Sequence, residues 1–219
     1  MAFSSLAEID SYMKENTCEF WEAVIREEAR DSQQPKMDIV NRMTQMYRAM
    51  KEADEAYDDT LTSHSGLSGK NGKKMADYAA THKCMCGEFG GAVMARAIKM
   101  AESNACMKRI VAAPTAGSCG VVPAILITYE RMTNTSENDM VKALFVAAGI
   151  GDVIARRASI SGARGGCQAE IGASSAMAAG ALAWLKSGSS HLITQAAAMA
   201  LKSLLGLVCD PVAGLVEVP

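Results

Sequence analysis

The sequence predicts an all-α globular domain, and three observations lead to this prediction. Apolar residues recur at three- and four-residue steps in several long segments, which is the periodicity of helices packed on a core. The period-two alternation of half-buried strands is not convincing anywhere along the chain. Aromatic residues make up only 5% of the sequence, whereas it contains 15 Met and 18 Gly. Small residues and Met suit close helix packing, while strands favour aromatic and β-branched side chains.

The N-terminal quarter of the chain, residues 4–57, has the pattern of two or three amphipathic helices. Asn16 and Glu19 form a candidate capping pair ahead of an apolar face. Pro35 can open the next helix. An apolar stripe runs along that helix and consists of Met37, Val40, Met43, Tyr47 and Met50. We interpret the stripe as core packing rather than as a ligand-binding strip, because Met fills irregular gaps in cores.

The rest of the chain alternates helical segments with polar or Gly-rich loops. Loops are expected at residues 60–73, 113–120, 159–167 and 207–219. Helices are expected near 88–103 and 121–132, from the capping pair Ser136 and Asp139 through Ala148, and over 170–186 and 190–206. A chain of 219 residues can bury one substantial core. We predict an N-terminal helical segment over 1–34 and a main domain over 35–219.

Composition and charge exclude several classes of function. A formal net charge of −2 gives no field for holding nucleic acid. Residues 110–129 are uncharged and could mimic a membrane span, but Pro114, Gly117, Gly120 and Pro123 interrupt them, so we expect no membrane insertion. The seven cysteines are an odd number, and the first ten residues hold acids and no apolar signal core. We therefore expect a cytoplasmic protein with reduced thiols.

Two of the expected loops have the chemistry of an anion site. Residues 113–120 combine glycines, which let a ligand approach the backbone, with the hydroxyls of Thr115 and Ser118. Residues 63–69 are similarly rich in Ser and Gly. Free N–H groups at helix ends bind carboxylates and other anions. Such loops also occur as simple tight connections, so by themselves they leave the function open.

The cysteines offer two arrangements of metal ligands. Cys167 and Cys209 each lie in a small-residue setting with a carboxylate nearby, but 41 residues separate them. That spacing is too long for a local chelating knuckle and is more typical of structural thiols. His82, Cys84 and Cys86 could contribute to a zinc site, but no second pair at zinc-finger spacing follows. We interpret the remaining histidine near a helix start, His191, as a surface or capping residue.

Four segments together form one recognisable set. They are Ser65-Gly66-Leu67-Ser68-Gly69, Ala113-Pro114-Thr115-Ala116-Gly117, the stretch from Ser161-Gly162 to Gly165-Gly166-Cys167-Gln168-Ala169-Glu170, and Cys209-Asp210-Pro211-Val212-Ala213-Gly214-Leu215-Val216. In order and spacing they resemble the alpha subunit of bacterial iron–sulfur L-serine dehydratases. The resemblance extends from about residue 35 to Pro219.

The resemblance implies conversion of L-serine to pyruvate and ammonia without pyridoxal phosphate. It implies a [4Fe–4S] cluster held by three cysteines, whose open iron acts as a Lewis acid on the serine hydroxyl. Cys167 and Cys209 correspond to two of these ligands. The third would follow directly after Pro219, so the sequence resembles an alpha chain truncated at its C-terminus. We expect a cluster that lacks a ligand to be labile or absent.

The resemblance and the loop chemistry together suggest roles for individual residues. Substrate contact is expected from Ser63, Ser65, Gly66, Thr115 and Gly117. Hydrogen bonds that order the loops around the cluster are expected from Gln168, Glu170 and Asp210. His64 is the candidate base on this chain for the α-proton of the substrate. The resemblance instead places a histidine base in a partner beta subunit.

Other functions compete with this interpretation. A cysteine-desulfurating lyase would use the same type of cluster. A non-catalytic truncated relic or a helical module that binds a partner is a different class. A pyridoxal-phosphate dehydratase is disfavoured, because the α/β alternation of that fold is absent from the sequence. A Met-rich helical surface should expose apolar area, so we expect association with a beta chain or with further copies of the chain.

Overall fold

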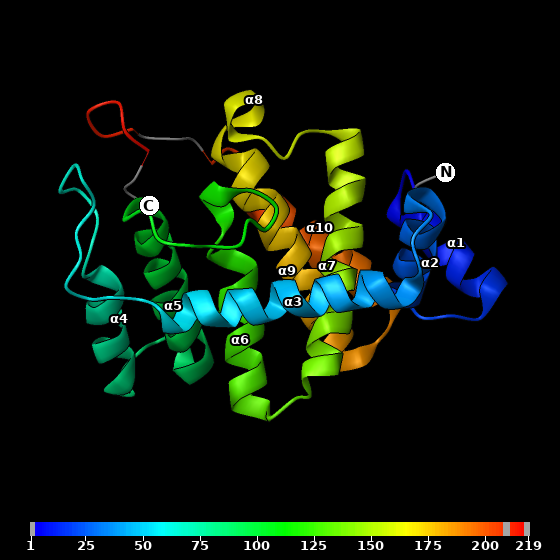
Figure 1. The fold of residues 1–219 in the computed structure, drawn as a ribbon, viewed down its shortest axis with the longest axis horizontal. Coiled ribbons are helices and arrows are strands. Elements are labelled where there is room, and N and C mark those ends of the chain that lie inside the picture. Colours follow the sequence, from blue (N-terminus) through cyan, green and yellow to red (C-terminus); the bar gives the residue numbers. More distant parts are fainter. Residues whose placement is uncertain (1–2, 208–210, 217–219) are drawn as a thin grey trace.

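Helices form nearly all of the regular structure in the computed structural model, which describes residues 3–207 and 211–216 (Figure 1). Within these ranges the only β pairing is an isolated bridge between Val212 and Leu215. The all-α prediction is therefore confirmed. The search of the described residues for a helix long and apolar enough to cross a membrane found none.

The chain folds into ten α-helices within the described ranges, with one 3₁₀ turn and one π-helical turn between them. The helices are α1 (Leu6–Asn16), α2 (Phe20–Ser32), α3 (Lys36–Glu55), α4 (Asn71–Ala80), α5 (Gly87–Ala105), α6 (Val121–Thr133), α7 (Glu137–Arg157), α8 (Gly162–Cys167), α9 (Ala173–Ser187) and α10 (Ser190–Ser203). The 3₁₀ turn η1 spans Ala116–Ser118, and the π-helical turn η2 spans Gln168–Gly172.

The core lies where α6, α7 and α9 meet. Leu126 of α6, Ile150 of α7 and Ala178 of α9 are completely or almost completely buried. Helices α7 and α9 approach closely because Gly180 has no side chain: a Cβ at this position would lie 2.1 Å from Cδ1 of Ile150. The small residues of α9, Gly180 among them, thus allow close helix packing, as the sequence predicted.

The first three helices confirm the prediction for residues 4–57. Ile9 of α1 and Phe20 of α2 belong to the same buried cluster as α7, and the division of the chain at residue 34 stays a prediction. The predicted capping pair of Asn16 and Glu19 was wrong. Glu19, not Asn16, is the N-cap of α2, and it exchanges hydrogen bonds with Glu22, because Asn16 still belongs to α1 and bonds back to Tyr12.

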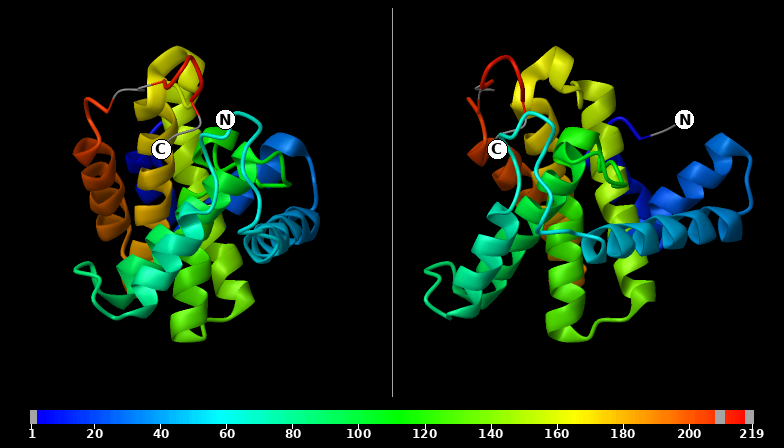
Figure 2. Two further views of the ribbon diagram at one scale, coloured as in Figure 1. Left: turned by 90° about the vertical axis from the view of Figure 1, so that its left-hand side faces the viewer. Right: turned by 60° about the vertical axis from the view of Figure 1, so that its left-hand side comes forward.

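The apolar stripe of α3 packs on the core over most of its length. Tyr47 and Met50 are buried, and Val40 and Met43 pack against the core from its edge. Met37 departs from the prediction, because 69% of its surface is exposed. It lies in the first turn of α3, which projects away from α6 and α7 (Figure 2).

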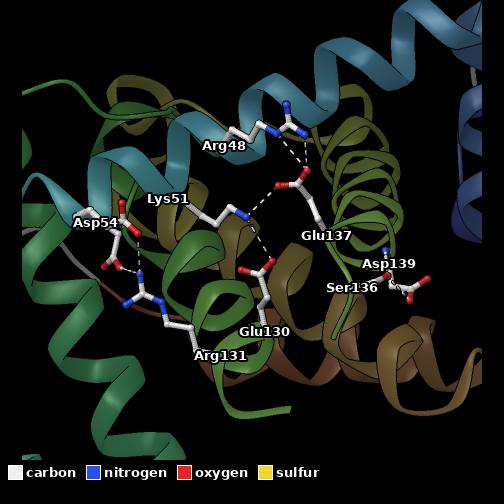
Figure 3. Close-up of polar contacts among 9 residues, drawn as sticks. Arg48, Lys51, Asp54, Glu130, Arg131, Ser136, Glu137 and Asp139 are labelled. Atoms are coloured by element: carbon white, nitrogen blue, oxygen red, sulfur yellow. Dashed lines mark hydrogen bonds and ion pairs between the residues drawn. The ribbon is translucent and has the colours of Figure 1, made fainter. Parts of the chain in front are cut away.

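Charged side chains fix α3 across the ends of its neighbours (Figure 3). Arg48 and Lys51 of α3 both pair with Glu137 at the start of α7, at 2.7 and 3.0 Å. Further along α3, the side chain of Asp54 is only 6% exposed and receives Arg96 of α5 at 2.8 Å and Arg131 of α6 at 3.3 Å. A buried carboxylate with two guanidinium partners holds three helices together.

Several boundaries differ from the sequence predictions. Helix α4 falls where a loop and an unassigned segment were expected, and α7 continues past Ala148 to Arg157. The expected loop 159–167 contains the short helix α8, and the helix expected from residue 170 begins with the turn η2. Helix α10 ends at Ser203, earlier than residue 206. The capping pair of Ser136 and Asp139 is confirmed, because the Ser136 hydroxyl accepts from the Asp139 N–H at 3.2 Å.

Candidate active site

The four loops of the predicted site gather at one end of the helical bundle. Figure 2 shows the loop before α4, the loop before α6, the helix α8 and the segment 211–216 at the same end. These segments lie far apart in the sequence. Their convergence confirms none of the predicted residue roles, but it makes a shared site geometrically feasible.

The loop before α6 is held by several hydrogen bonds. The Ser118 hydroxyl lies 3.2 Å from the Thr115 hydroxyl and 3.3 Å from the carbonyl oxygen of Ala113. From α9, the completely buried Ser174 donates to the same carbonyl at 2.9 Å. From α5, the side-chain amide of Asn104 donates to the carbonyl oxygen of Ala116 at 3.1 Å. Two helices therefore fix the backbone that presents Thr115 and Gly117.

Glu170 links this loop to α8. The Thr115 hydroxyl donates a hydrogen bond of 2.7 Å to Oε1 of Glu170. A Cβ on Gly117 would lie 2.7 Å from Oε2 of Glu170, and a Cβ on Gly162 would lie 2.5 Å from the same atom. Real Cβ atoms do not approach this closely, so the carboxylate occupies space that only glycines leave open. The structure thus brings Thr115, Gly117 and Glu170 together and adds Gly162 to them.

Cys167 lies one helical turn before Glu170, at the junction of α8 and η2. The backbone bends sharply at Gly166, whose φ of 67° and ψ of −167° interrupt the helical conformation. Positive φ is accessible to Gly without steric cost, so the bend that positions Cys167 depends on this residue. Cys167 is half-buried. A partly exposed thiol at a loop junction has the access that a metal ligand needs.

Gln168, the residue after Cys167, points toward the end of α10. Its side-chain amide nitrogen lies 3.4 Å from the carbonyl oxygen of Leu201. Its Oε1 atom is buried and has no hydrogen-bond partner in the described part of the chain. Because a buried acceptor without a donor is costly, Oε1 marks a place where a further donor group would be stabilising.

Cys209 and Asp210 lie outside the described residues, so their predicted roles cannot be placed in the site. The segment that follows them, 211–216, contains a tight turn. Val212 and Leu215 exchange backbone hydrogen bonds of 3.0 and 2.9 Å, and Ala213 and Gly214 both have positive φ. This is the geometry of a two-residue hairpin turn with left-handed central residues.

The Ser-rich loop before α4 is closed on itself. The buried Ser63 hydroxyl accepts from the N–H of Ser68 at 3.2 Å and lies 3.0 Å from the hydroxyl of Ser65. The backbone N–H of Gly66 donates to the carbonyl oxygen of Ser63 at 2.9 Å. His64, Ser65 and Gly66 are exposed on the outside of this loop. Ser63 thus has a structural function in the loop, and substrate contact stays a prediction for it.

Glu102 of α5 positions that loop and was missed by sequence reasoning. Its buried carboxylate accepts from the backbone N–H groups of Asn71 at 2.7 Å and Gly72 at 3.0 Å, and from the Tyr57 hydroxyl at 2.8 Å. The carboxylate therefore caps the first turn of α4. The pKa of Tyr57 is raised, first by burial and then by its bond to Glu102. An acid between Met100 and Ser103, on the buried side of a helix, was the signal available in the sequence.

The alternative metal site in the turn between α4 and α5 finds no support. No group of three or more His, Cys, Asp or Glu side chains among the described residues is arranged to hold a metal ion. Cys86 and His82 are exposed, and Cys84 packs over Gly91. His191 is exposed in the first turn of α10, in keeping with its interpretation as a surface residue.

The fold and this end of the bundle define an all-α protein whose site combines a carboxylate, hydroxyls and a thiol on converging loops. Residues 15–219 match the family described as serine dehydratase alpha chain. The chain is 39% identical over 99% of its length to a probable L-serine dehydratase alpha chain of Bacillus subtilis, and covers 72% of that protein. It is 35% identical over 97% of its length to the L-serine dehydratase alpha chain of Peptoniphilus asaccharolyticus, and covers 73% of it.

A shorter stretch is similar to a longer enzyme. The chain is 46% identical over 124 residues, 56% of its length, to L-serine dehydratase 1 of Escherichia coli, of which it covers 27%. Because the family match and two relatives extend over nearly the whole sequence, the chain belongs to the serine dehydratase alpha chain family.

Proposed function

We propose that this chain is the alpha subunit of an L-serine dehydratase, which converts L-serine to pyruvate and ammonia in the cytoplasm. The family match supports the reaction class. The observation that carries the assignment to this end of the bundle is the junction of Thr115 with Glu170, one turn after Cys167. It joins two loops of the predicted site, and the reaction needs polar groups and a metal ligand in one place.

We further propose that Cys167 and Cys209 supply two thiolate ligands to a [4Fe–4S] cluster. The described residues fit this role in one respect, because Cys167 is partly exposed and follows the sharp backbone bend at Gly166 at the start of a helical turn. When bound, the cluster supplies a Lewis acid for the departing hydroxyl group. Gln168 and Asp210 are proposed to orient the loops that carry the two thiols.

The protein's own residues bind and orient the substrate in this proposal. Backbone N–H groups of the two Gly-rich loops, with the hydroxyl of Ser65, bind the substrate carboxylate, while the Thr115 hydroxyl orients Glu170 beside them. Gly66 and Gly117 let the backbone approach it. A base must remove the α-proton. His64 is the candidate on this chain, since it is exposed in the loop before α4, and the alternative is a base from a beta chain.

The first test is anaerobic reconstitution with iron and sulfide, followed by the visible absorption spectrum and by pyruvate release from L-serine. A brown species in the wild-type protein and in Cys86→Ser, whose thiol is at the N-terminal end of α5, would show that the chain holds a cluster, although we expect that cluster to be labile. Cys167→Ser should be colourless and inactive. Equal colour and equal turnover in both variants would refute the assignment of Cys167.

Two further arms of this experiment address substrate and partner. L-cysteine and L-threonine are assayed beside L-serine, because a pocket discriminates a single methyl group by only about 10- to 200-fold. Sulfide release from L-cysteine without pyruvate release from L-serine would favour the desulfurating lyase. Addition of a beta chain should raise turnover, and His64→Gln should leave turnover unchanged if the base comes from that chain.

A further inference from the structure

Glu170 has one carboxylate oxygen with a partner and one without. Oε1 accepts the hydrogen bond from Thr115. Oε2 receives no donor from the described part of the chain, and within it no lysine or arginine forms an ion pair with Glu170. Oε2 is also not among the buried atoms that lack a partner, so it can be reached by solvent. The site therefore contains an accessible acceptor that has no ion-pair partner among the described residues.

Two residues without side chains lie beside Oε2. Cβ atoms built on Gly117 and Gly162 would lie 2.7 and 2.5 Å from this oxygen, and Gly117 is exposed. Alanine at either position would push the carboxylate away. The two glycines thus let Oε2 lie close to the backbone of the loop before α6 and of α8.

We propose that Oε2 of Glu170 binds the ammonium group of the substrate and thereby selects amino acids over the corresponding hydroxy acids or plain acids. This proposal rests on the proposed function, because it assigns a substrate group to a residue of the same site. An ammonium group has three donors and no acceptor, and a carboxylate oxygen is its strongest neutral-pH partner. The bond to Thr115 holds the carboxylate in place, so that little rotamer freedom is lost on binding.

The location of Glu170 suits this role within the proposed reaction. It lies one helical turn after Cys167, so the ammonium group would be fixed near the thiol proposed to hold the cluster. In serine the amino and hydroxyl groups are on adjacent carbon atoms. A residue that binds one of them close to Cys167 therefore also limits where the other can lie.

The test compares two ligands that differ only in the ammonium group and cannot lose a hydroxyl. Dissociation constants of L-alanine and propanoate are measured by ligand-observed NMR on the holoenzyme, for wild type, Glu170→Gln and the control Glu88→Gln on α5. A charge-assisted hydrogen bond of about 1.5–3 kcal/mol corresponds to roughly a 10- to 150-fold change. We expect Glu170→Gln to weaken L-alanine by this factor and to leave propanoate and the control unchanged.

The outcomes separate this proposal from the proposed function. Equal weakening of both ligands in Glu170→Gln would show a structural role only and would overturn the ammonium site, as would no change in either. Wild-type protein that prefers L-alanine in a Glu170-dependent manner but releases no pyruvate from L-serine would keep the ammonium site and refute the dehydratase assignment. Turnover of L-serine without a Glu170-dependent preference for L-alanine would keep the dehydratase assignment and refute the ammonium site.

Discussion

Thr115 and Glu170 are 55 positions apart in the sequence and are joined by a hydrogen bond of 2.7 Å between Thr115 Oγ1 and Glu170 Oε1. The bond joins the loop before α6 to the turn η2 before α9. It places a charged acceptor opposite a neutral hydroxyl donor, which makes it stronger than a bond between two neutral groups.

Thr115→Val removes this donor with little change in shape. We expect the free energy of unfolding to fall by about 1–2 kcal/mol, because a hydrogen bond to a charged group is lost at a half-buried site. L-serine turnover should fall more than stability predicts, because Glu170 is no longer held. Thr115→Ser keeps the hydroxyl and serves as the control. Urea denaturation and initial rates measure the two effects, and equal turnover in Val and Ser variants would contradict the prediction.

Gly162→Ala tests the space around Glu170 directly. The added Cβ would lie 2.5 Å from Oε2 and 2.7 Å from Cδ of Glu170. The far end of a flexible side chain can move, so we expect the carboxylate to be displaced and the fold to remain, with a melting temperature within a few degrees of wild type. The Thr115 bond should be lost in a crystal structure of the variant. An unmoved Glu170 would disprove the tight contact.

Glu102 explains why one helix escaped sequence prediction. Helix α4 has only ten residues, and no side chain of its N-cap residue, Lys70, caps it. Its first two N–H groups instead bond to Glu102, about thirty positions later, and Gly72 lies against the backbone of Lys99 at a distance that excludes a Cβ. Both stabilising contacts come from residues of α5, which are distant in the sequence. Local periodicity and local capping patterns were therefore too weak to predict α4.

The candidate site shows the same division between local and tertiary information. Loop composition indicated Thr115 and Gly117, because small and polar residues at helix ends are visible in a sequence, and the family resemblance added Glu170. Their mutual contact, and the part of Gly162 in it, depend on how η2 and α9 pack beside α6. Helix α6 was predicted almost to the residue, since its apolar run follows a Pro/Gly loop that marks its start.

Glu137 gives the fold a defined pH dependence. Its hydrogen bonds from Arg48 and then Lys51 lower the pKa of the carboxyl from 4.5 to about 2. A depressed folded-state pKa stabilises the protein above the unfolded value and loses that contribution as pH falls from 4.5 toward 2. After discounting for solvent screening, we expect a contribution on the order of 1 kcal/mol at neutral pH.

Glu137→Gln is the corresponding variant. This variant should be less stable than wild type at about pH 7. The difference in the free energy of unfolding should shrink as pH falls to about 3, because the wild-type carboxylate then contributes less to stability. Urea denaturation at several pH values measures the difference. Asp152→Asn alters an exposed pair with Arg156 within one helix and serves as the control, with a much smaller effect. A difference in the free energy of unfolding that does not change with pH would contradict the lowered pKa of Glu137.

Gly180 and Ile150 allow a paired test of the α7–α9 contact. Gly180→Ala should destabilise the protein by about 1–3 kcal/mol, because the added Cβ would lie 2.1 Å from Cδ1 of Ile150 and the core has no room to relax. Ile150→Val removes that atom and should cost about 1 kcal/mol alone. The two substitutions together should cost less than their sum, since each relieves the defect of the other. Additive costs in urea denaturation would show that the helices separate instead.

The thiols should differ strongly in reactivity. Burial raises the pKa of Cys119 to about 11, and the residue is 2% exposed, whereas Cys86 is exposed at the start of α5. The thiolate is the reactive form, so Cys119 combines a very small thiolate fraction at neutral pH with blocked access. Brief treatment with iodoacetamide, followed by peptide mass spectrometry, should find Cys86 alkylated and Cys119 unmodified. In denaturant both should react. Modification of Cys119 in the folded protein at the rate of Cys86 would mean that the loop before α6 opens readily, and with it the wall of the site that carries Thr115 and Gly117.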